Sequence, residues 1–150
     1  MNIPDKLLIR RMEDYHTHHM GRASNGQLFW GYETFVYLVP PEERQEQNWL
    51  QYRLDYAIMH FFGQDGNYLS SRSYCGGTAD KCKVDFEEIL DEWVSELGEV
   101  EYNDIEVKLF QTEIDGHIFG LIQDEEYDAI SLEPSSLISF MEPWDGEYYT

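Results

Sequence analysis

The sequence has few cysteines, no long apolar run and none of the common catalytic motifs. Its two cysteines, Cys75 and Cys82, lie in a glycine-rich segment, and two cysteines in a cytoplasmic chain are more often free thiols than a disulfide. No run of about 18 apolar residues occurs, so we expect no membrane-spanning helix. The N-terminal apolar run, Leu7 to Ile9, is too short for a signal peptide and is flanked by charge. We therefore expect a cytoplasmic protein.

Basic residues are scarce in the C-terminal part of the chain. Residues 84–150 contain 20 acidic residues and one lysine, Lys108, for a net charge of −19, whereas residues 1–83 have a net charge of −1. Because phosphate contacts require Lys and Arg, we expect no nucleic-acid binding, and no anionic membrane surface as partner. The charge then serves solubility alone, or it pairs with a basic protein surface, which raises association rates and suppresses wrong partners.

The length and the aromatic content favour one folded domain spanning residues 1–150. A chain of 150 residues is long enough to bury a core, and aromatic residues make up 15% of it. The strongest local signal is Asp115-Gly116 within residues 105–122, because a type I′ hairpin turn needs positive φ at both central residues. This turn places Phe110 opposite Leu121 and Lys108 opposite Gln123. Both faces are apolar at the middle, which predicts interior strands covered on both sides.

The remaining segments predict an α+β fold with antiparallel sheets in βββ-α-βββ order. Asn25-Gly26 predicts a first hairpin, and Gly31 in its second strand indicates a bulge or a close backbone approach. The expected segments are a helical lead-in (1–14), the first hairpin (15–39), a connector with one helical turn (40–51), two strands (52–62, 68–74), a loop (75–83), the main helix (85–97), the hairpin at 105–122, a strand (127–132) and a short strand or helical turn (137–141).

The main helix is predicted by its start signal and its periodicity. Asp85 is a suitable N-cap with Glu88 three residues later, and Gly98 is a suitable stop. The apolar positions recur at helical spacing and predict a core-facing stripe. The opposite face is acidic, with no Lys or Arg at i+4, and consists of Glu87, Glu88, Asp91, Glu92 and Glu96.

Two acidic elements and two aromatic residues are the candidate binding residues. The acidic helix face is one element, and the other is a predicted turn formed by Asp124, Glu125, Glu126 and Asp128. Tyr127 and Trp144 could anchor an interface, because Tyr and Trp are enriched among the residues that dominate binding energy. The alternatives are a solvated acidic surface and aromatic packing at the edge of the core.

A histidine cluster near the N-terminus is the candidate metal site. If this segment is a strand, His16 and His18 share one side, with His19 beside them. A third ligand would come from His60, His117, Cys75 or Cys82, but the spacing matches no zinc motif. The simpler interpretation is a polar edge strand, and we expect His60 and His117 to be satisfied by local hydrogen bonds. We therefore predict no cofactor and no catalytic residue.

Several stretches resemble small bacterial proteins described as HycA-like formate hydrogenlyase regulatory proteins. The matching stretches are Gly21 with NGQLF (25–29), HFFGQDGNYL (60–69), GTAD (77–80), EYNDIEVKLFQTEIDGHIFGLI (101–122) and PWDGEYYT (143–150). The resemblance implies a non-enzymatic regulator that opposes a transcriptional activator. The residues themselves favour a small acidic inhibitory protein of the immunity type, which occupies a basic surface of a partner. A small metal-dependent enzyme using His16, His18 and His19 is the alternative.

Overall fold

The computed structural model describes residues 3–12, 14, 16–43, 48–124, 126, 128–135 and 138–150. Its largest sheet has five antiparallel strands in the order β5-β4-β3-β2-β6, and a four-stranded sheet has the order β11-β10-β9-β8. Strands β1 and β7 form a separate pair. The strands are β1 (Leu7–Ile9), β2 (His19–Ala23), β3 (Leu28–Tyr37), β4 (Arg53–Phe62), β5 (Tyr68–Thr78), β6 (Val100–Tyr102), β7 (Ile105–Val107), β8 (Phe110–Ile114), β9 (His117–Asp124), β10 (Ala129–Glu133) and β11 (Ser139–Phe140).

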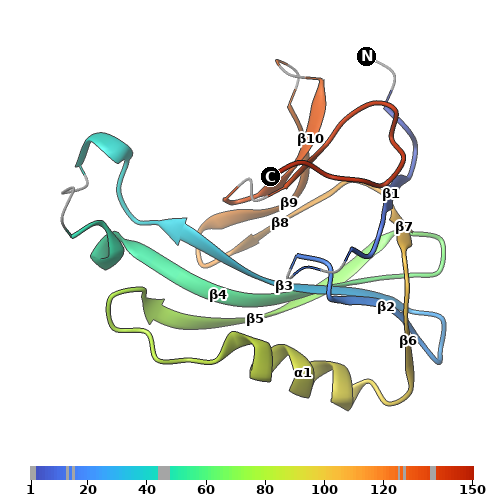
Figure 1. Cartoon of the computed structure of the whole chain (residues 1–150), viewed down its shortest axis with the longest axis horizontal. Helices are drawn as coiled ribbons and strands as arrows, with labels where there is room; N and C mark the ends of the chain where they lie inside the picture. The colour runs from blue at the N-terminus through green and yellow to red at the C-terminus, as the bar shows by residue number, and fades with distance from the viewer. Residues whose placement is uncertain are drawn as a thin grey trace.

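The five-stranded sheet is the middle of three layers (Figure 1). Helix α1 (Phe86–Glu96) covers one face of this sheet, and strands β8 to β11 lie over the other. Two 3₁₀ turns, Pro41–Glu43 and Trp49–Tyr52, lie in the connector between β3 and β4. The α+β class, the antiparallel pairing and the single main helix are as the sequence predicts.

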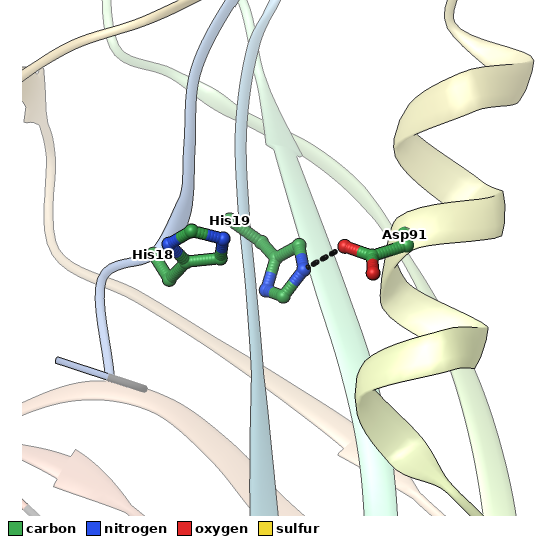
Figure 2. A group of neighbouring side chains, drawn as sticks. All are labelled: His18, His19 and Asp91. Carbon is green, nitrogen blue, oxygen red and sulfur yellow. Dashed lines mark hydrogen bonds and ion pairs between the residues drawn. The ribbon is translucent and has the colours of Figure 1, made fainter.

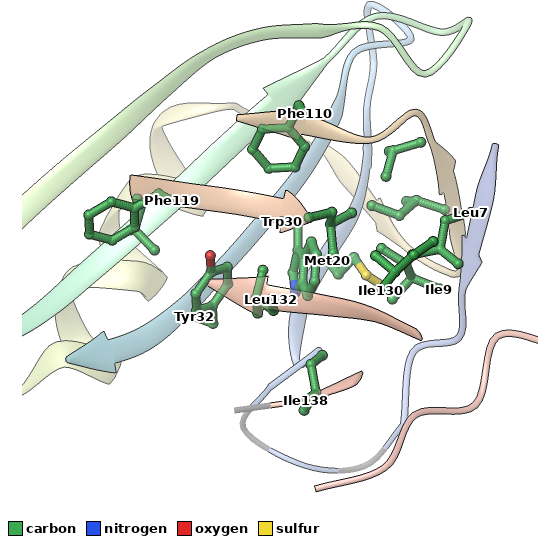
Figure 3. Packing of buried hydrophobic residues seen from close by; sticks show 14 of the residues in the cluster. Leu7, Ile9, Met20, Trp30, Tyr32, Phe110, Phe119, Ile130, Leu132 and Ile138 are labelled. Carbon is green, nitrogen blue, oxygen red and sulfur yellow. The ribbon is translucent and has the colours of Figure 1, made fainter. Parts of the chain in front are cut away.

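Strand β3 is buried on both faces because it lies at the centre of the middle layer. Trp30 and Tyr32 point into the larger core, which is formed with β8 to β11 and with the β1–β7 pair (Figure 3). Phe29 points into the smaller core under α1. A Cβ at Gly31 would lie 2.7 Å from Met59 Cε and 3.0 Å from a Leu90 methyl group. The close approach predicted at Gly31 is therefore confirmed, and it lets α1 lie against the sheet.

The two predicted hairpins and the predicted helix are confirmed. Asp115 and Gly116 have φ values of 53° and 81°, and Phe110 pairs with Leu121. Strands β2 and β3 are joined across Asn25-Gly26. The Asp85 side chain accepts a hydrogen bond from the Glu88 amide, as the capping box requires.

Three local predictions are wrong because tertiary pairing overrides local signals. Within the predicted helical lead-in (1–14), Leu7–Ile9 form strand β1 instead, and Leu7 and Ile9 are buried where β1 pairs with β7. The predicted loop (75–83) begins as strand, since β5 continues to Thr78 alongside β4. Burial and pairing stabilise β1 as a strand, and pairing with β4 extends β5, although the local sequence does not signal either strand.

The third correction concerns the strand before the Asp115-Gly116 turn. Residues 105–114 form two strands in different sheets, β7 and β8, separated by Lys108 and Leu109. The predicted pairing of Lys108 with Gln123 is therefore wrong. Strand β8 is also an edge strand of its sheet, and Ile118 opposite it is 39% exposed. The prediction of strands covered on both sides fails because the chain changes sheets at Lys108.

The C-terminal tail is held to the body by Tyr148. Its hydroxyl lies 2.6 Å from both carboxylate oxygens of Asp14 and 3.1 Å from Thr17 Oγ1. Ser139 and Tyr149 form a short backbone bridge. The tail thereby fixes the segment that precedes β2, where the candidate site lies.

Candidate functional site

A pocket of about 480 Å³ lies where the segment before β2 meets β3 and α1. Trp30 Nε1 donates a hydrogen bond to the carbonyl of His16, and Thr17 Oγ1 accepts one from the Met12 amide. These bonds hold the segment in a turn over the end of the middle sheet. The pocket is lined by Arg11, Met12, Asp14, His18, His19, Glu33, Glu87 and Leu90.

His19 is the buried polar centre of this pocket. Its side chain is 3% exposed, and its Nε2 lies 2.7 Å from Asp91 Oδ1 on α1 (Figure 2). Because an ionised carboxylate only accepts hydrogen bonds, Nε2 carries a proton, and in the neutral ring Nδ1 then has the lone pair. His19 Nδ1 is buried and has no hydrogen-bond partner. Such an orphaned acceptor costs free energy unless something binds it.

The side chains of His18 and His19 lie beside each other, whereas neighbouring side chains of a regular strand point to opposite faces. Their ring centroids are 4.7 Å apart and the rings are nearly perpendicular. Residues 16–18 form a turn before β2 begins at His19, so the strict alternation of strand side chains does not apply. One ligand atom each from His18, His19 and Asp91 lies within 4.8 Å of the others.

The predicted histidine cluster is therefore only partly assembled. His16 is buried at the edge of the Tyr148 ring, with its Nδ1 3.6 Å from Asp14 Oδ1, and it is not in the group with His18 and His19. Burial lowers the pKa of His16 and outweighs the opposing effect of Asp14. Sequence reasoning placed His16 and His18 on one strand, which is wrong. It also missed Asp91 as a neighbour, because the contact depends on how α1 docks.

The pocket has an excess of negative charge. Glu33 is half-buried on the helix side of β3, and its pKa is raised by burial and then by the nearby carboxylates of Glu87, Asp85 and Asp55. Among the described residues, no cation forms an ion pair with Glu33.

Arg11 is the basic residue of this pocket, and it is held at the rim. It lies over the Tyr102 ring at 4.6 Å and donates from Nε to the His18 carbonyl at 3.1 Å. A second guanidinium nitrogen lies 3.4 Å from His18 Nδ1. Arg11 therefore neutralises only the His18 side of the pocket.

The acidic face of α1 is exposed as predicted, and two of its five carboxylates have partners from the sheet. Asp91 bonds His19, and Glu96 forms an ion pair with Arg72 of β5. Arg72 also lies over the Trp93 ring at 4.7 Å. Residue spacing along the helix does not reveal these partners, because they belong to strands β2 and β5. The exposed carboxylates without an ion pair among the described residues are Glu87, Glu88 and Glu92.

The second acidic element does not join this face. The C-terminal end of β9, at Asp124, and the described residues before β10, Glu126 and Asp128, lie at the end of the molecule opposite α1 (Figure 1). Glu125 and Tyr127 lie outside the described residues. Trp144 is half-buried against the larger core. The two acidic elements therefore form separate surfaces, and Trp144 lies with the core.

The remaining chemistry-bearing residues lie away from the pocket. His60 is fully buried, with Nε2 2.8 Å from the Tyr32 hydroxyl and Nδ1 2.6 Å from Ser71 Oγ, which confirms its expected local hydrogen bonding. His117 lines a second cavity of about 600 Å³ between β3 and β9. Cys75 and Cys82 are free thiols, as expected.

Comparison of the chain with family models, curated proteins and solved structures found no match. The resemblance to HycA-like regulatory proteins therefore stays a prediction. Among the described residues, no helix is long and apolar enough to cross a membrane.

Proposed function

We propose that this protein is a non-enzymatic binding module that occupies a basic surface of a partner protein. The observation that carries the proposal is the half-buried Glu33, which lies in a pocket beside Glu87 with no cation paired to it in the described chain. A Lys or Arg side chain from a partner would neutralise this carboxylate. The binding surface is the pocket together with the adjoining carboxylates Glu88 and Glu92.

The energetic argument depends on the surroundings of Glu33. Burial and the neighbouring carboxylates both disfavour its charged form, as the raised pKa indicates. A guanidinium that enters the pocket removes the repulsion and can form paired hydrogen bonds with a carboxylate. The exposed carboxylates of α1 contribute mainly to the rate of encounter, because rim charges act through long-range attraction.

Two biological roles fit this surface. An immunity-type protein would cover the cationic active site of a toxin such as a nuclease. A regulatory protein of the HycA-like kind would occupy an activator instead. Both act by blocking a partner in the cytoplasm, the compartment that we propose and that the two free thiols fit.

The test is binding to basic proteins encoded beside the gene for this protein. We expect a complex whose association rate falls steeply between about 50 and 500 mM salt, since screening removes long-range attraction. Glu33→Gln should weaken the complex about tenfold or more, because it removes one partner of a desolvated charge pair, whereas Glu87→Gln should mainly slow association, because Glu87 is exposed. Glu126→Gln, at the opposite end of the molecule, is the matched control. Salt-independent binding, or equal weakening by Glu126→Gln, would contradict the proposal.

A further inference from the structure

We infer that His18, His19 and Asp91 form a binding site for a divalent transition-metal ion of the Zn²⁺ type. The three residues come from the turn before β2, from β2 itself and from α1, and each offers one ligand atom within 4.8 Å of the others. This inference goes beyond the proposed function, because it requires no basic partner.

The unpartnered nitrogen of His19 is the observation that distinguishes this group from a chance cluster. His19 is 97% buried, yet its Nδ1 has no hydrogen-bond partner. Figure 2 shows this second ring nitrogen on the side of the ring turned toward His18. A buried nitrogen without a partner beside a second imidazole is the arrangement that a metal ion satisfies. Asp91 joins as the third ligand by exchanging its hydrogen bond to His19 Nε2 for the ion.

The geometry needs only a small adjustment to hold an ion. Neighbouring ligand atoms around tetrahedral Zn²⁺ lie roughly 3.3 Å apart, because Zn–N and Zn–O distances are about 2.0–2.2 Å. The largest separation, 4.8 Å or less, must therefore shrink by about 1.5 Å at most. His18 and Asp91 are both exposed and can supply this movement by side-chain rotation, whereas buried His19 stays in place.

The ligand set selects the class of ion. Two imidazoles and one carboxylate suit Zn²⁺, Co²⁺ or Ni²⁺, whereas Mg²⁺ and Ca²⁺ prefer oxygen ligands alone. Three protein ligands leave a further coordination position open. Glu87 lies one helical turn before Asp91 and lines the pocket on that side. Its charge adds to the attraction for a cation.

The positive charge of Arg11 should weaken the affinity of the site for a metal ion, which provides a separate test. Its guanidinium lies 3.4 Å from His18 Nδ1, where its positive charge repels a bound cation. Removing this charge should therefore strengthen metal binding, while removal of a ligand should weaken it. A purely structural role for the three residues predicts no such opposite effects.

The experiment is calorimetric titration of the metal-free full chain with Zn²⁺, with Co²⁺ absorption as a second readout. We expect one Zn²⁺ per chain and visible Co²⁺ bands of tetrahedral coordination. His18→Ala, His19→Ala and Asp91→Asn should each lower the Zn²⁺ affinity about tenfold or more. Arg11→Gln should raise it. Circular dichroism and thermal unfolding check folding, and the exposed positions 18 and 91 keep the test valid if His19→Ala fails to fold.

Matched controls separate a site from diffuse attraction to an acidic surface. Glu92→Gln removes the same charge from the next residue of α1, and His117→Ala removes an imidazole that lines the other cavity. Both should leave Zn²⁺ affinity within about twofold of wild type. The inference is overturned if wild type binds no stoichiometric Zn²⁺, if Glu92→Gln weakens binding as much as Asp91→Asn, or if excess Mg²⁺ displaces Zn²⁺. Because no partner is present, these outcomes are independent of the partner-binding test.

Discussion

Acidification should destabilise this protein through His60. Its side chain is 0% exposed, and burial lowers its pKa from 6.5 to about 3. The folded-state pKa is therefore below the unfolded-state value, so the unfolded chain binds the proton first as pH falls. The stability contributed by neutral His60 is complete above about pH 6.5 and is lost progressively as pH falls toward 3.

The magnitude follows from the size of the shift. At pH 4 the unfolded chain binds a proton at His60 and the folded protein does not, because pH 4 lies about 2.5 units below the unfolded-state pKa and above the folded-state pKa. At 1.36 kcal/mol per unit, this lowers the free energy of unfolding by about 3 kcal/mol between pH 7 and pH 4. Domains are typically stable by about 5–15 kcal/mol, so this is a large fraction. Glu33 acts in the opposite direction, because its raised pKa favours protonation of the folded state.

A variant isolates the contribution of His60 from the other titrating groups. His60→Gln keeps a polar side chain between Tyr32 and Ser71 but cannot titrate. Urea unfolding at pH 7, 6, 5 and 4, followed by tryptophan fluorescence, gives the free energy of unfolding for both proteins. We expect wild type to lose about 3 kcal/mol more than His60→Gln between pH 7 and pH 4. Parallel pH dependences would refute the reasoning, because His60 would then titrate alike in both states.

Three substitutions test the packing and the turns, each by urea unfolding at pH 7. Gly116→Val should lower the free energy of unfolding by about 1 kcal/mol or more, because residue 116 has a φ of 81°. No atom lies within 4 Å of the new Cβ, so the cost comes from the backbone conformation and not from a clash. Unchanged stability would contradict the hairpin register. Gly21→Ala should cost more than about 2 kcal/mol, since its Cβ would lie 2.0 Å from the Glu101 carbonyl oxygen and force β2 from β6. Tyr148→Phe should lower the free energy of unfolding by about 1–3 kcal/mol, because it removes the hydrogen bonds of the hydroxyl to Asp14 and Thr17; a neutral effect would mean that the tail does not hold the segment before β2.

The elements with strong local signals were predictable from sequence. The helix at Phe86–Glu96 has a cap, a stop and an apolar stripe that all agree. The turns at Asn25-Gly26 and Asp115-Gly116 depend on backbone conformations that few residues adopt. In each case a local interaction determines the structure, so no knowledge of distant residues is needed.

The segments that depend on a distant partner were not predictable. Leu7 to Ile9 is a strand because Ile105 to Val107 is available to pair with it. The sheet change at Lys108 has no local signal, since the apolar alternation continues through it. The candidate site could not be predicted for the same reason, because His19 bonds Asp91, which lies 72 residues away in the sequence.

The sequence by itself determined the antiparallel α+β class, the place of the main helix and the concentration of charge in residues 84–150. Periodicity, turn chemistry and charge are properties of neighbouring residues, which is why they can be read before folding. Only the tertiary structure decided that the two acidic elements lie at opposite ends and that His18 and His19 meet Asp91 rather than His16. Those outcomes depend on how α1 docks on the middle sheet, and docking is set by the packing of side chains that are distant in sequence.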